Sequence, residues 1–142
     1  MPPESALDAA LRALRHRDRS SSELRNRLAE QGYESGEREE AIETLVRTGV
    51  ADDARYAETR ARSLAERGAG DLRIRHELGR AGISAEVAQQ ALETLESEAD
   101  RARSIARRRG EGPKTARYLR GKGFSDDVIA GVVASGRDDE LG

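Results

Sequence analysis

The chain has 142 residues, which is enough for one domain or a short array of small helical units and excludes several independent cores. Only 36% of its residues are hydrophobic and 3% aromatic, while 37% are charged, so any core must be thin and aliphatic. Its 25 basic and 27 acidic residues nearly cancel, and the absence of Cys excludes a disulfide framework and a thiolate metal site.

The first residues, Met-Pro-Pro-Glu-Ser, lack the basic and apolar regions of a secretory signal. No run of about 18 apolar residues follows that could cross a membrane. We therefore expect a cytoplasmic protein without membrane contact, in which residues 1–5 form a flexible N-terminus.

One pattern occurs three times along the chain: an apolar residue or Thr, Leu four positions later, Gly four positions after that, and then a large apolar residue. Residues four apart share one helix face, and Gly just past the last turn ends a helix in the left-handed conformation. Each copy therefore predicts a helix that packs through its Leu and stops at its Gly. The copies are Leu24, Leu28, Gly32 and Tyr33, then Ile74, Leu78, Gly82 and Ile83, then Thr115, Leu119, Gly123 and Phe124.

A further helical stretch precedes each copy and another follows it, each with apolar residues at helical spacing. The preceding stretches are expected to bury Leu7, Leu11 and Leu14, then Tyr56, Ala57, Ala61 and Leu64, then Ala102, Ile105 and Ala106. The following stretches offer Ala41, Ile42 and Leu45, then Val87, Ala91, Leu92 and Leu95, then Val128, Ile129, Val132 and Val133.

Helix starts are indicated by side chains that can accept hydrogen bonds from a first helical turn. Ser20 with Glu23 makes a capping box. The other predicted N-caps are Asp53, Asp71, Ser84 and Ser125.

These patterns predict an all-α protein made of three tandem three-helix repeats, about nine helices in all, in an elongated, curved array. The repeats are expected over residues 6–49, 50–98 and 99–136, followed by an acidic tail over 137–142. A unit of this size cannot bury much apolar surface alone, so neighbouring units should support one another.

Stretches of these repeats resemble the RecX family of recombination regulators over nearly the whole chain. They are Arg19-Ser-Ser-Ser-Glu-Leu-Arg-Asn-Arg-Leu28, Gly49-Val-Ala-Asp-Asp-Ala-Arg-Tyr-Ala57, Arg73-Ile-Arg-His-Glu-Leu-Gly-Arg-Ala-Gly-Ile83 and Arg117-Tyr-Leu-Arg-Gly-Lys-Gly-Phe124. The resemblance implies a non-enzymatic protein that binds the RecA filament on single-stranded DNA. It further implies that the protein lies in the filament groove and inhibits filament extension, ATP hydrolysis and strand exchange.

Basic residues are concentrated near the end of the chain. Residues 99–124 hold nine Lys and Arg against two acidic residues, a charge of +7, whereas residues 125–142 hold one Arg against five acidic residues, a charge of −4. Such a stretch predicts either weak, non-specific contact with DNA or contact with acidic surfaces of RecA. The alternative is a solvated helical face whose basic residues form ion pairs with Glu residues of neighbouring units. The candidate contacts are Arg107, Arg108, Arg109, Lys114, Arg117, Tyr118, Arg120 and Lys122, with Arg73, Arg75 and Arg80 at related positions.

No pattern typical of catalysis or of a cofactor site is found. Asp52 and Asp53 are explained by capping, and neither His16 nor His76 has a partner at metal-ligand spacing. Tyr33, Tyr56 and Phe124 are expected in the core, which leaves Tyr118 as the one aromatic contact to test. We therefore predict no enzyme, no cofactor, no metal site and a monomer.

Two other functions remain open. A three-helix unit with a basic second helix can bind duplex DNA directly in the manner of a helix-turn-helix protein. An array of helices can also hold a helix of another protein in an apolar groove.

Overall fold

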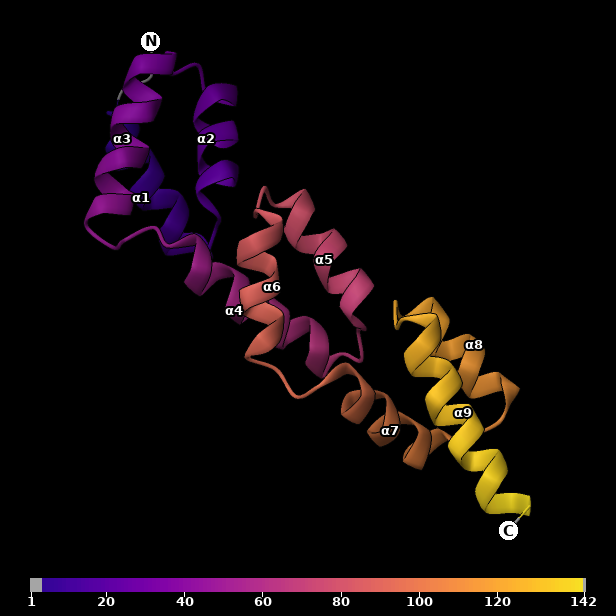
Figure 1. Ribbon diagram of the computed structural model, residues 1–142. Coiled ribbons are helices and arrows are strands. Elements are labelled where there is room, and N and C mark those ends of the chain that lie inside the picture. The colour runs from indigo at the N-terminus through magenta and orange to yellow at the C-terminus, as the bar shows by residue number, and fades with distance from the viewer. Residues whose placement is uncertain (1–3, 142) are drawn as a thin grey trace.

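The computed structural model describes residues 4–141, with side chains for residues 4–133, and this part of the chain forms nine helices and no strand. Figure 1 shows them in one elongated row from the N-terminus to the C-terminus. The predicted all-α class with three-helix repeats is confirmed. The helices are α1 (Ala6–His16), α2 (Ser21–Glu30), α3 (Ser35–Arg47), α4 (Asp53–Glu66), α5 (Asp71–Arg80), α6 (Ala85–Glu93), α7 (Glu98–Arg109), α8 (Pro113–Gly121) and α9 (Asp126–Leu141).

The helices pack in three groups, which we call the first unit (α1–α3), the second unit (α4–α6) and the third unit (α7–α9). Each unit has its own hydrophobic cluster. The repeated Leu residues lie at these centres, since Leu28, Leu78 and Leu119 are at most 1% exposed. The boundaries 6–49, 50–98 and 99–136 and the flexibility of residues 1–5 stay predictions, and the side chains of the acidic tail lie outside the described residues.

The repeated Gly ends the second helix of each unit in the same way. Gly32, Gly82 and Gly123 have φ of 91°, 80° and 90°, which a side chain would strain. The next residue in each copy then donates its N–H to the carbonyl of the repeated Leu, at 3.1, 3.0 and 3.0 Å. This is the closed turn expected when Gly follows the last helical residue.

The first helix differs from its prediction. Ala6, Ala9, Ala10 and Ala13 are at most 3% exposed, whereas Leu7, Leu11 and Leu14 are only partly buried beside them. Small side chains on the inner face let α1 approach its neighbours closely, and this leaves the larger leucines along the flank.

Neighbouring units meet at their ends, where the start of one helix lies on the Gly turn of the next unit. Between the first and second units, the buried Ser20 hydroxyl donates to the carbonyl of Ala81. An ideal Cβ on Gly82 would lie only 2.3 Å from the Ser22 side chain. Between the second and third units, the N–H groups of Gly70 and Leu72 donate to the carbonyls of Lys122 and Gly123 at 2.9 and 3.0 Å.

A carboxylate closes each of these junctions. Asp53, the first residue of α4, accepts hydrogen bonds from the N–H and hydroxyl of Ser21, both at 2.8 Å. Glu98, the first residue of α7, accepts from the N–H of Asp71 at 2.6 Å and from the hydroxyl of Ser125 at 2.9 Å. Each carboxylate thus satisfies a free N–H at the start of a helix in the preceding unit, where the helix dipole also favours negative charge.

Two predicted N-caps are therefore wrong. Asp52 caps α4 and Gly70 stands at the N-cap of α5, one position before the predicted Asp53 and Asp71. The predicted residues are the first of their helices, and their carboxylates bond across a junction instead of to their own helix. The capping box of Ser20 and Glu23 and the Ser84 cap are confirmed.

Gly70 provides a test of the close approach between units. Its ideal Cβ would lie 2.4 Å from the N of Phe124 and 2.5 Å from the carbonyl carbon of Gly123, both backbone atoms that cannot move alone. We expect Gly70→Ala to lower the free energy of unfolding by about 1–3 kcal/mol, as overpacking does, and to change small-angle X-ray scattering. Gly79→Ala on the same helix, where nothing lies within 4 Å, should be neutral or stabilising. Equal melting curves for the two variants would contradict the described junction.

Candidate binding surface

A basic crevice lies between the second and third units. Two adjoining cavities of about 310 and 330 Å³ share Glu66 and Gly68 from the end of α4 and Ile105 and Arg108 from α7. Five arginines and two glutamates line them, so positive charge prevails there. The arginines are Arg62, Arg67, Arg101, Arg108 and Arg109.

Tyr118 of α8 forms one wall of the basic crevice and is partly buried. The Cζ of Arg109 lies 3.6 Å from the centroid of its ring, and the Nζ of Lys122 lies 5.7 Å away. Both distances suit cation–π interaction. Arg109 therefore occupies a face of the ring, and a base could stack on that face only after Arg109 moved.

Arg101 is a structural member of the basic stretch. Its guanidinium donates to the carbonyls of Ala69 and Glu96 at 2.9 and 3.0 Å and pairs with Asp71. It also lies over the ring of Phe124, and its side chain is only 10% exposed. These contacts use its donors to hold the third unit against the second, which leaves it little capacity for a ligand.

Five basic residues of the third unit are exposed, and no ion pair is formed by them within the described residues: Arg107, Arg108, Arg109, Lys114 and Arg117. Arg120 differs, because its Nε lies 3.4 Å from a carboxylate oxygen of Asp126. Arg103 pairs with Asp100, and this pair, with the Ser97 hydroxyl, lowers the pKa of the Asp100 carboxyl. In the described part of the chain, no Glu of the neighbouring unit forms an ion pair with these side chains, although Glu66 lines the same cavities as Arg108.

The three candidates of the second unit do not form one site with the others. Arg73 does approach the third unit, where it donates to the carbonyl of Gly121 at 3.2 Å. Arg75 instead donates to Gln89 at 2.6 Å, and Arg80 lines a separate cavity between the first and second units.

Arg62 and Arg67 belong to the basic crevice but were missed by the sequence analysis. They lie on or just after α4, whose end reaches the third unit, where Lys122 donates to the carbonyl of Arg67 at 3.3 Å. The repeat could have indicated these two residues. If the junctions between units are equivalent, the end of the first helix in each unit lies beside the next unit.

Two negative findings apply to the residues that the structure describes. No group of three or more His, Cys, Asp or Glu side chains is placed to hold a metal ion. Likewise, none of the described helices is both long enough and apolar enough to span a membrane.

Comparison with known proteins shows similarity along nearly the whole chain. The family models for the first and second three-helix domains of RecX match residues 6–45 and 52–92. The regulatory protein RecX of Halorhodospira halophila is 35% identical over 98% of this chain and 93% of its own length. That of Chromohalobacter salexigens is 37% identical over 89% of this chain and 90% of its own.

Solved structures show the same fold at lower identity. The crystal structure of RecX from Lactobacillus salivarius has a TM-score of 0.79 at 23% identity and covers 92% of this chain and 93% of that one. A second crystal structure of regulatory protein RecX has a TM-score of 0.75 at 24% identity, over 89% of this chain and 70% of that one.

Substitution of Arg101 tests the division between structural and free basic residues. Arg101→Ala leaves Asp71 without its partner at a largely buried junction, so we expect the free energy of unfolding to fall by about 2–3 kcal/mol. Arg103→Ala removes an equal charge from the same helix, but its pair with Asp100 is about half exposed and should matter little. Chemical denaturation measures both. A similar loss for the two variants would show that Arg101 is not the structural residue described.

Proposed function

The chain belongs to the RecX family of regulatory proteins, and from this premise we propose that it binds RecA filaments on single-stranded DNA and inhibits their extension, ATP hydrolysis and strand exchange. The protein acts by binding, as a monomer, and performs no reaction of its own. The DNA within the filament contributes a weak contact that does not depend on base sequence.

The observation that carries this proposal is the set of exposed basic side chains on α7 and α8 that have no acidic partner. Charged side chains without partners attract phosphates at little cost, because no existing ion pair has to be broken. Such contacts lack base specificity and weaken as salt concentration rises. The residues of this set that we assign to contact with the filament are Arg107, Arg108, Arg109, Lys114 and Arg117. We add the neighbouring Tyr118, Lys122 and Arg73, and Arg120, whose ion pair with Asp126 is exposed.

The elongated shape also supports inhibition by binding. A row of three small units joined at their ends presents a long surface for a modest chain length (Figure 1). Such a surface can contact more than one subunit of a filament at a time. A ligand that holds neighbouring subunits in one arrangement opposes any motion or addition that requires another arrangement.

The direct test is ATP hydrolysis by RecA on single-stranded DNA with the purified protein added. We expect inhibition at less than one copy per RecA, because blocking the growing end of a filament affects every later addition. Unchanged hydrolysis at equimolar protein would reject the proposed function.

The assigned surface is tested by Lys114→Gln combined with Arg117→Gln. Both side chains are exposed on α8, and loss of two phosphate contacts should raise the half-inhibitory concentration about 10-fold and lower the salt slope of binding by about 2. The control is Arg15→Gln with Arg47→Gln, an equal charge change at exposed positions of the first unit. If the control weakened inhibition as much, net charge alone would explain the effect and the surface assignment would fail.

Direct binding to duplex DNA is the outcome that would favour a helix-turn-helix role. Gel-shift titrations with and without RecA separate the two functions, because filament binding predicts weak, non-selective DNA association by the protein alone. Tight, sequence-selective binding to duplex DNA without RecA would replace the proposed function.

A further inference from the structure

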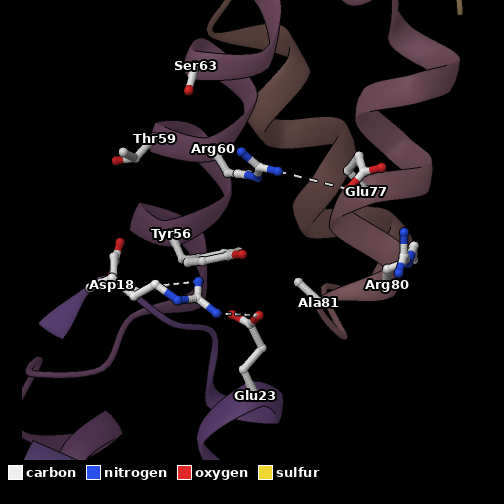
Figure 2. A pocket seen from close by; sticks show the side chains of 10 residues that line it. Asp18, Glu23, Tyr56, Thr59, Arg60, Ser63, Glu77, Arg80 and Ala81 are labelled. Carbon is white, nitrogen blue, oxygen red and sulfur yellow. Dashed lines mark hydrogen bonds and ion pairs between the residues drawn. The ribbon is translucent and has the colours of Figure 1, made fainter. Parts of the chain in front are cut away.

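A second crevice lies between the first and second units, and its lining is of mixed charge. It has a volume of about 540 Å³ and receives side chains from the loop after α1, from α2, from α4 and from α5. Figure 2 shows Arg60 of α4 and Glu77 of α5 pointing toward one another across it, with Tyr56 below them. We call it the mixed-charge crevice; its charged residues are Arg17, Asp18, Glu23, Arg60, Glu77 and Arg80.

The mixed-charge crevice occupies the same place in the repeat as the basic crevice. Arg17 and Arg67 both stand three residues before the N-cap of the second helix of their unit, at Ser20 and Gly70. Glu77 and Tyr118 both stand five residues before the repeated Gly of the next unit. Two equivalent junctions therefore form two equivalent crevices with different side chains.

The charges of the two crevices differ at these equivalent positions. Asp18 corresponds to Gly68, again counted from the N-caps, and Glu77 corresponds to Tyr118, whereas the counterpart of Glu23, Arg73, does not line the basic crevice. The mixed-charge crevice thus has three arginines and three carboxylates, where the basic crevice has arginines in excess. Because this crevice presents carboxylate acceptors as well as guanidinium donors, it suits a peptide, which has backbone N–H donors beside its acceptors, better than a DNA backbone, whose phosphates only accept.

Two of the carboxylates are already engaged by the protein. Glu23 accepts the N–H of Ser20 at 3.0 Å in the capping box. Burial and the nearby Glu23 raise the pKa of the Tyr56 phenol. Asp18 accepts the N–H of Arg19 at 3.1 Å.

The guanidinium groups of Arg60 and Arg80, in contrast, form no hydrogen bond within the described residues. Arg60 forms an ion pair with Glu77 at 3.9 Å and Arg17 forms one with Glu23 at 3.7 Å, both longer than a hydrogen bond, and Arg17 also donates to the carbonyl of Asp18 at 3.5 Å. The Arg80 side chain is exposed and forms no ion pair or hydrogen bond within the described residues. Guanidinium donors that line one crevice and form no hydrogen bond are suited to a carboxylate, which can accept two parallel hydrogen bonds.

We propose that the mixed-charge crevice binds an acidic segment of a protein partner, with an Asp or Glu carboxylate of that segment held by Arg60 and Arg80. The hydroxyls of Thr59 and Ser63, which also line the crevice, can bond the backbone of the same segment. The proposed function assigns no role to this crevice. Under this proposal the two equivalent junctions bind different ligands: the crevice between the second and third units binds phosphates, and the crevice between the first and second units binds protein.

The test follows the arginine Nε–H signals of the labelled protein by NMR, with hexaglutamate as probe and a single-stranded oligothymidylate present in saturating amount to occupy the basic surface. We expect hexaglutamate to shift the signals of Arg60 and Arg80, and oligothymidylate alone to leave them in place. The double variant Arg60→Gln, Arg80→Gln should bind labelled hexaglutamate about 10-fold more weakly while its affinity for oligothymidylate is unchanged. Arg15→Gln with Arg47→Gln, an equal charge change outside the crevice, should bind both as wild type does.

Two results would overturn the proposal. Hexaglutamate shifts that disappear once oligothymidylate is bound would place the peptide on the basic surface alone. Oligothymidylate shifts at Arg60 and Arg80 would make the crevice a nucleic-acid site. Melting curves verify that the variants fold, and because no RecA is present, this test and the hydrolysis test can fail independently.

Discussion

The structure depends on one contact, in which the start of a helix in one unit rests on the glycine turn of the next and a carboxylate closes the joint. Two helix starts, at Ser20 and Gly70, make this contact through Ala81 and Lys122. The three hydrophobic clusters share no side chains, so the units are held together by these joints and by the polar contacts beside them, such as that of Arg101 with Ala69 and Asp71. An elongated row follows from such joints, because units that meet only at their ends cannot collapse into one compact bundle.

The same arrangement explains why this protein has crevices at all. End contact between units leaves a cavity beside each joint, and the one at the first joint also extends between α4 and α5 of the second unit. Because the joints are equivalent, the gaps are equivalent, and a few substitutions suffice to change their charge. Glu77 in one and Tyr118 in the other show how a repeated frame can carry two different surfaces.

Local features could be predicted from the sequence, and features that span two units could not. The spacing of Leu78 and Gly82 reports one helix and its end, because four-residue periodicity and left-handed glycine are properties of a single segment. Asp53 was misread as a cap, since its partner Ser21 lies 32 residues away and only the joint brings them together. Arg80 is predicted from its place in the repeat to act with the basic stretch, yet it lines the other cavity, because sequence position does not tell which crevice a side chain enters.

In the first and third units, one side of the joint has no neighbouring unit to contact. The residues at these positions affect whether two molecules can associate through the same contact. Ala6 stands where Asp53 and Glu98 stand in the other units, so this position has no carboxylate. Pro113 stands where Ser21 and Asp71 stand, so this position has no N–H to donate to a carboxylate. Two molecules brought head to tail would find neither partner of the hydrogen bond. A head-to-tail contact that could otherwise repeat into open-ended fibres therefore lacks the carboxylate hydrogen bond between copies.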